Sequence, residues 1–428
     1  QVRSSLFFRI KKTTWASFTQ PKSGRWFFSS LYFIMRETMK NIIYTLLITC
    51  IVASCADVPE EYSNTETLEK PVSNNLQYVD IANAKSLFIS SSTSSGRTSS
   101  RGGSKNKLFK ITEDGAVLEI EYKDSDNNSY TVTQQPISID NVNIDYVVFS
   151  FGGDKINVTE CYLANKSTGV VYDLGSSKCP VPQGQSTEKM ILTDNKNNFY
   201  YRYYAPVEGY YLRQVNYTDS DNITATQHIV GTESIDHFVV DSNGNIAYTA
   251  SIGSKEVYRM RESDGRYSNL PYTQYWIGLD GNITSNEYIT NQHYKFKLSN
   301  KLIAVRDGSD TPIVIDNGTE INTLNLPLSE ISIAKSSSNY VYISGTDNSS
   351  DNTVIVKFNP NDNSFSQIYT DGTYNLYNFN VTSDDYIIFS ALRMNDGKNV
   401  LGKIDKDGDL TITYESDDEK IIILETIN

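Results

Sequence analysis

The sequence predicts an all-β fold for residues 76–428, and three observations support this prediction. Apolar positions with helical spacing are nearly absent after residue 76. Short runs rich in Val, Ile, Tyr, Phe and Thr, which favour strands, alternate with turns rich in Asn, Asp, Gly and Ser. Two strands, a variable loop and two further strands around a tight turn recur along the chain.

The chain opens with a segment that carries no fold signal. Residues 1–38 are basic and aromatic without a regular period, and we interpret them as an upstream extension outside the native protein. Residues 39–54 then read as a signal peptide. Lys40 supplies a positive charge, and the apolar run at 42–53 is shorter than the ~20 residues that cross a bilayer.

The apolar run ends in Val52-Ala53-Ser54-Cys55, which resembles the lipobox of bacterial lipoproteins. The resemblance covers the signal segment only. It implies cleavage before Cys55, acylation of the Cys55 thiol and anchoring of the mature chain in a membrane. The alternative is a buried apolar segment with an incidental cysteine.

Residues 55–75 are predicted to be the lipidated cysteine followed by a flexible tether, because 56–75 are polar and lack a hydrophobic pattern. Asp57, Glu60 and Glu61 resemble the surface-export signals of some Gram-negative lipoproteins. The expected location is therefore the bacterial cell envelope, in the outer membrane, on its periplasmic or its surface side.

The charge of the mature part argues against nucleic acid as a partner. The whole chain has a net charge of −13, and residues 1–55 contribute eight Lys or Arg against one acidic residue. The remaining body therefore carries a net charge near −20. Such a body repels nucleic acid and anionic lipid headgroups. The expected partners are the membrane through the lipid, and a glycan, a small molecule or an envelope protein.

The repeat is clearest in its second strand pair. The seven copies span 108–122, 161–174, 212–229, 257–270, 312–326, 354–369 and 400–414. Matching first pairs lie at 190–204, 237–250, 331–344 and 379–392. A four-stranded unit every 40–50 residues resembles the blades of β-propellers, because one blade cannot cover both faces of its own sheet.

We therefore expect about seven four-stranded blades over 76–428, with tandem β-sandwiches as the alternative fold. The unit around 276–326 fits worst, because it contains extra material at 280–300. The terminal run Lys420–Ile427 is strand-like, and we expect it to complete the first blade and close the ring.

Blade topology places the loops between second and third strands, and the links between blades, on one face. These loops are longer and more varied than the tight turns of the other face, so we expect binding there. Aromatic side chains gather in or beside them, and they suit sugar faces or protein contacts. The candidates are Tyr203, Tyr204, Tyr210, Tyr211, Tyr272, Tyr275, Trp276, Tyr374 and Tyr377. The alternative is that these rings pack between blades.

Two further features leave their interpretation open. Residues 90–105 are rich in Ser and carry Arg97, Arg101 and Lys105; they are a disordered insertion or a basic docking arm. Cys161 and Cys179 are candidates for a disulfide, which an oxidising envelope permits, or are two unpaired thiols.

No metal or cofactor is predicted. The acidic turn of Asp405, Asp407 and Asp409 departs from the EF-hand pattern, and a β-turn is the preferred interpretation, with weak surface calcium as the alternative. The three His residues form no metal motif, and the chain has no nucleophile elbow and no phosphate-binding loop.

Whether the protein is an enzyme stays open, with the sequence leaning against it. The first hypothesis is an envelope lipoprotein whose propeller binds a ligand or a partner through its longer-loop face. A polysaccharide-degrading hydrolase or lyase on the same fold is the second, and convergent carboxylates near the ring axis would favour it. The third is a scaffold for outer-membrane assembly, which an exposed blade edge would favour.

Overall fold

The computed structural model describes residues 64–70, 76–92, 106–123, 135–152, 158–175, 178–183, 189–205, 209–228, 234–290, 292–306, 313–318, 320–350, 352–370 and 372–426. The signal peptide, Cys55 and the basic side chains of the 90–105 loop lie outside these residues. None of the described residues forms a helix that is long and apolar enough to cross a membrane.

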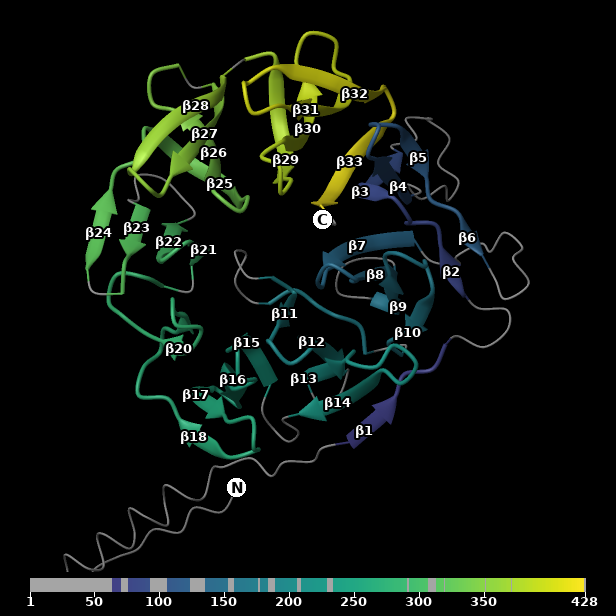
Figure 1. Ribbon diagram of the computed structural model, residues 1–428, viewed down its shortest axis with the longest axis vertical. Helices are drawn as coiled ribbons and strands as arrows, with labels where there is room; N and C mark the ends of the chain where they lie inside the picture. The colour runs from purple at the N-terminus through teal and green to yellow at the C-terminus, as the bar shows by residue number, and fades with distance from the viewer. Residues whose placement is uncertain are drawn as a thin grey trace, which may run out of the picture. The chain divides into compact units, whose positions relative to one another are not determined.

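The body is a ring of seven antiparallel sheets of four strands each, joined in one sheet by a fifth strand (Figure 1). The first three sheets, each written from the axis outward, are blade 1 (β33 Glu419–Thr426, β3 Ala84–Ser92, β4 Asn106–Thr112, β5 Val117–Glu119), blade 2 (β7 Gln135–Asn141, β8 Tyr146–Gly152, β9 Val158–Asn165, β10 Val171–Asp173) and blade 3 (β11 Ile191–Thr193, β12 Asn198–Ala205, β13 Gly209–Asn216, β14 Thr224–His228).

The other four sheets are blade 4 (β15 Ser234–Val240, β16 Ile246–Ile252, β17 Lys255–Arg261, β18 Tyr267–Asn269), blade 5 (β21 His293–Leu298, β22 Lys301–Arg306, β23 Ile313–Asp316, β24 Ile321–Leu324), blade 6 (β25 Leu328–Ser336, β26 Val341–Asp347, β27 Thr353–Asn359, β28 Ser364–Thr370) and blade 7 (β29 Tyr374–Val381, β30 Ile387–Arg393, β31 Asn399–Ile404, β32 Leu410–Ser416). The seven-bladed β-propeller is thus confirmed, and tandem β-sandwiches are excluded.

The burial of each strand follows from its place in the blade. The second strands are covered on both faces by neighbouring blades, so β8, with the sequence YVVFSFG, is buried along its whole length. Outer strands alternate instead: in β32, with the sequence LTITYES, exposed and half-buried side chains follow one another. The core therefore consists of apolar clusters between adjacent blades.

The terminal strand closes the ring as expected. β33 pairs antiparallel with β3, from Ser86↔Thr426 to Ser92↔Glu419. Its Ile421 and Leu424 are buried against blade 7 and blade 1 side chains. The poor match near 280–300 is explained as well, because the small sheet of β19 (Trp276–Ile277) and β20 (Ile283–Thr284) is inserted between blades 4 and 5.

The first described residues are not a free tether. β1 (Asn64–Thr67) pairs with β14 and becomes the fifth strand of blade 3. The chain then passes the outer strand of blade 2, where the amide of Asp173 donates to the carbonyl of Glu69. It next forms β2 (Tyr78–Val79), which pairs with β6 (Tyr122–Lys123). The flexible tether is therefore wrong for 64–67, because the open edge of β14 offers backbone groups that a polar segment can pair with.

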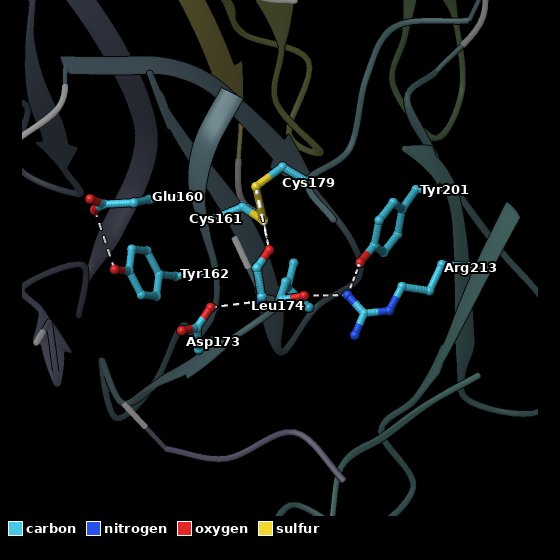
Figure 2. The surroundings of a disulfide bond; sticks show 9 residues. Glu160, Cys161, Tyr162, Asp173, Leu174, Cys179, Tyr201 and Arg213 are labelled. Carbon is cyan, nitrogen blue, oxygen red and sulfur yellow. Dashed lines mark hydrogen bonds between the residues drawn. A yellow bond between two sulfur atoms is a disulfide. The ribbon is translucent and has the colours of Figure 1, made fainter. Parts of the chain in front are cut away.

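Cys161 and Cys179 form a disulfide with a Cα–Cα distance of 5.5 Å. Cys161 lies on β9, and Cys179 lies in the link from blade 2 to blade 3. In Figure 2 the disulfide lies beside Leu174, and the Leu174 carbonyl accepts a hydrogen bond from the guanidinium of Arg213. The bridge thus joins blade 2 to the segment that leads into blade 3.

Candidate functional site

The structure separates the nine aromatic candidates into two groups. Tyr203, Tyr211, Tyr275 and Trp276 are buried. The Tyr203 hydroxyl donates to Gln227 Oε1 at 2.6 Å, and the Tyr275 hydroxyl lies 2.8 Å from Thr249 Oγ1. These four side chains belong to the packing between blades, so the expectation that they face a ligand is corrected.

The parity of the strands decides which tyrosines are buried. Tyr203 pairs with Tyr211 across β12 and β13, and Tyr204 pairs with Tyr210 in the next row. Successive side chains point to opposite faces of a sheet. The first pair therefore enters the core between blades 2 and 3, whereas Tyr204 remains 39 % exposed.

The other candidates are partly exposed, but they do not gather at one place. Tyr272 is half-buried in the link after blade 4. Tyr374, on β29, meets the ring of Phe389 edge-on with centroids 6.1 Å apart. Tyr377 on the same strand lies under Lys420, whose Nζ is 3.8 Å from the ring centroid. Only Tyr204 and Tyr210 form a pair in which both rings have some exposure.

We call Tyr204, Tyr210 and Arg202 the tyrosine platform. The two rings have centroids 5.2 Å apart, and the guanidinium carbon of Arg202 lies 4.2 Å from the centroid of the Tyr210 ring. Arg202 is buried and donates to the carbonyls of Pro182 (2.9 Å), Ile235 (2.8 Å) and Asp236 (2.9 Å). These bonds hold the guanidinium, which in turn packs against the Tyr210 ring.

A charged cluster lies at the tight-turn end of the inner strands, where sequence reasoning placed nothing. Lys335, Asn380 and Glu425 occupy corresponding register positions of blades 6, 7 and 1. Asn380 Nδ2 donates to Glu425 Oε2 at 3.5 Å. Burial raises the pKa of the Glu425 carboxyl, and the charges of Lys335, Lys189 and Lys166 oppose that rise. Among the described residues, the charged groups that act on Glu425 are therefore the ammonium groups of lysines. The cluster thus differs from a pair of carboxylates.

The sequence held one signal for this cluster. Lys335 and Glu425 each follow apolar residues near the end of an inner strand, in the segments ISIAKS and IIILET. Charged residues are almost never buried without a partner. Without knowledge of which strands meet at the axis, however, the two residues cannot be paired from the sequence.

The acidic turn of blade 7 is a hydrogen-bonded β-turn in this structure. Asp405 Oδ1 accepts from the amides of Asp407 and Asp409, each at 2.9 Å, and Gly408 has a φ of 91°. Over the whole described part of the chain, no three His, Cys, Asp or Glu side chains are grouped so that they could hold a metal ion.

Two buried histidines give a testable dependence of stability on pH. His237 on β15 is 4 % exposed, and neither ring nitrogen has a hydrogen-bond partner. Burial, with help from the charges of Lys295 and Arg202, lowers the pKa of His237 to about 3. Burial and two cations likewise lower the pKa of His293 to about 4. At a pH between these lowered pKa values and 6.5, both rings therefore stay neutral in the folded protein, whereas they are protonated in the unfolded chain.

A lowered histidine pKa means that stability is lost as the pH falls from 6.5 toward the folded-state value, because the unfolded chain binds more protons. We expect His237 alone to reduce the free energy of unfolding by about 2 kcal/mol between pH 7.5 and pH 5. Urea unfolding at both pH values measures this loss. The His237→Gln variant should lose about 2 kcal/mol less than the parent over that interval, and an equal loss in both proteins would contradict the assignment.

Comparison with known proteins identifies no family. No protein-family model matches the chain, and no curated protein matches it.

Solved structures do match, at low identity. The β-propeller domain of the Trilobed protease from Pyrococcus furiosus shares 11% identity at a TM-score of 0.47, covering 80% of this chain and 100% of that chain. A putative 6-phosphogluconolactonase from Bacteroides uniformis shares 13% identity at 0.42, covering 80% and 99%. A quinonprotein alcohol dehydrogenase-like protein from Bacteroides thetaiotaomicron shares 9% identity at 0.41, covering 87% and 95%. Because every one of these scores is below 0.5, the fold assignment stands on the strand order of the chain itself.

Proposed function

We propose that this chain is a bacterial cell-envelope lipoprotein, held in the outer membrane by acylation of Cys55, whose propeller binds a ligand or a protein partner through its longer-loop face. The tyrosine platform carries the binding part of the proposal. It lies at the ends of β12 and β13 that adjoin the second–third loop of blade 3. This loop belongs to that face, but at 206–208 it is a short one. A glycan, a small nutrient and an envelope protein are the expected classes of ligand.

The platform suits recognition because its parts are already in place. A tyrosine offers a large apolar face and a hydroxyl while losing little conformational freedom. Here Tyr210 is fixed by Arg202, and Arg202 is fixed by three backbone carbonyls. Binding therefore does not have to order these side chains, and the free energy of contact appears in the affinity.

The Tyr204→Ala variant tests the platform. We expect it to weaken binding at least about 10-fold, which corresponds to ~1.4 kcal/mol. The measurement is titration with a panel of neutral and acidic oligosaccharides, together with capture of outer-membrane proteins from a detergent extract.

Tyr288→Ala is the matched control for that titration. Tyr288 is 50% exposed, lies in the link before blade 5, and belongs to none of the ring pairs of the described residues. Binding that survives Tyr204→Ala, or that is lost equally in Tyr288→Ala, would remove the platform from the proposal.

The Cys55→Ala variant tests the anchor separately. Without the thiol no acyl chain can be attached, so the variant should leave the membrane fraction and appear soluble in the envelope. Fractionation and intact mass of the mature protein measure this. A variant that remains membrane-bound with an attached lipid would contradict the assignment of Cys55.

A further inference from the structure

A cleft of about 530 Å³ lies on blade 6, beside the link 325–327 that leads into it from blade 5. One side of the cleft is the link 325–327, and the other side is formed by residues of blade 6. The blade 6 residues come from β25 to β28 and from the turn before β28.

The floor of the cleft is apolar. Val354 and Val356 on β27 are buried and lie two residues apart, so both side chains point to the same face of the sheet. Phe365 on β28 is half-buried, and its ring packs on Phe358 with centroids 5.1 Å apart. Leu326, in the link between the blades, closes the opposite side. A ligand that enters this cleft would contact the ring of Phe365, which packs on Phe358.

The rim of the cleft is polar: Asn363 and Gln367 contribute amides, and Asp347 contributes a carboxylate. Among the described residues no Lys or Arg lines the cleft itself, and Lys301 approaches it from outside, with its Nζ 3.5 Å from Asn363 Oδ1. The Gln367 amide is exposed on the same face as Phe365, two residues further along β28. Asp347 accepts hydrogen bonds from the amides of Ser349 (2.7 Å) and Ser350 (3.0 Å).

The hydrogen bonds to Asp347 fix the charge of the rim. The side chain and amide of Ser349 lower the pKa of the Asp347 carboxyl, so this group is ionised at neutral pH. The Asp347 carboxylate, with no cation among the described lining residues, disfavours an anionic ligand in the cleft. The amides and the carboxylate can donate to and accept from hydroxyl groups.

We infer that this cleft is a binding site for a neutral saccharide. A sugar ring has an apolar face, which fits the ring of Phe365, and peripheral hydroxyls, which fit the amides of Asn363 and Gln367. The volume lies within the roughly 300–1,000 Å³ of ligand sites that are lined by apolar groups with a few placed polar ones. An apolar peptide fits less well, because it would leave the polar rim groups without partners. The site is separate from the tyrosine platform of blade 3 and does not depend on Cys55.

The experiment is calorimetric titration of the purified protein with maltotetraose, cellotetraose, mannotetraose and chitotetraose, with tetragalacturonate as the acidic counterpart. We expect saturable binding of at least one neutral sugar, with Kd raised at least 10-fold in Phe365→Ala and several-fold in Gln367→Ala. Gln367 is exposed, so its variant should fold even if Phe365→Ala does not. Ser366→Ala is the matched control, since Ser366 lies between them in β28 and points to the opposite face.

Three results would overturn the inference. One is the absence of binding by all four neutral sugars, and another is equal or tighter binding of tetragalacturonate. The third is a neutral sugar whose affinity falls in Tyr204→Ala and is unchanged in Phe365→Ala and Gln367→Ala. That third result would place the sugar on the tyrosine platform and so support the proposed function while removing the cleft. Loss in the cleft variants with Tyr204→Ala unchanged supports the cleft alone.

Discussion

Leu424→Asp is expected to lower the free energy of unfolding by about 3–5 kcal/mol, because it places an unpaired carboxylate in a buried apolar position of the closing strand. Leu424 is 2% exposed and packs with Phe88 and Ile388 between blades 1 and 7. Equilibrium unfolding in urea, followed by circular dichroism, measures the change.

Ile422→Asp is the matched control in the same strand. Ile422 is 39% exposed and lies at the irregularity where the register of β33 shifts against β3. A charge there remains in water, so we expect a change within about 0.5 kcal/mol. Equal losses in the two variants would show that β33 responds to charge in general rather than to the burial of Leu424.

Truncation after residue 418 extends the same argument from one side chain to the whole strand. Removing β33 leaves the inner edge of β3 without its partner and uncovers the apolar side chains around Phe88. An open sheet edge with adjacent apolar surface invites association between chains. We therefore expect the truncated protein to aggregate. The two point variants keep β33 in the chain, so comparison with them separates the loss of ring closure from a loss of solubility.

The repeat could be predicted because each copy contains the local sequence signals of its own strands and turns. A second strand such as β16 is covered on both faces, so buried residues follow one another in its sequence IAYTASI. Such a run predicts a strand. The turn after β15 shows its signature too, since the Asp241 carboxylate accepts from the amides of Asn243 and Asn245. Both signals lie within a few residues of each other and need no knowledge of distant contacts.

The binding surfaces could be predicted only in part, because they depend on comparisons between distant segments. The choice between Tyr203 and Tyr204 is a matter of strand parity, which shifts by one residue at any bulge. The cleft on blade 6 brings together residues from β25 to β28 and the link before them, and the sequence does not show which of these residues are neighbours. β1 escaped prediction because its segment, NTET, has no apolar pattern and pairs with β14 through its backbone.

The contacts of β1 lead to the second large effect, at the ion pair that fastens it to the ring. Arg213 on β13 is 2% exposed and donates to the carboxylate of Glu66. It also donates to the carbonyl of Leu174 and to the hydroxyl of Tyr201 (Figure 2). Lys178 Nζ lies 2.9 Å from the same carboxylate. Burial raises the pKa of Glu66, but the hydrogen bonds and charges of Lys178 and Arg213 outweigh it and lower the pKa.

Glu66→Gln is expected to destabilise the protein by about 2–3 kcal/mol, because it leaves the buried guanidinium of Arg213 without its carboxylate. The lowered pKa fixes the sign of the pH dependence: the contribution of Glu66 is present above about pH 4.5 and is lost as the pH falls below it. Glu69→Gln, at an exposed position two residues after β1, is the control and should change little.

A double-mutant cycle separates the ion pair from the rest of the segment. In an Arg213→Met background no buried charge remains to be compensated, so Glu66→Gln should cost at most a few tenths of a kcal/mol. Coupling of 1 kcal/mol or more, measured by urea unfolding, would mean that β1 belongs to the folded domain and that residues 64–70 share its cooperative unfolding. Additive losses would instead mean that β1 opens independently of blade 3, in which case its pairing with β14 contributes little to the stability of the ring.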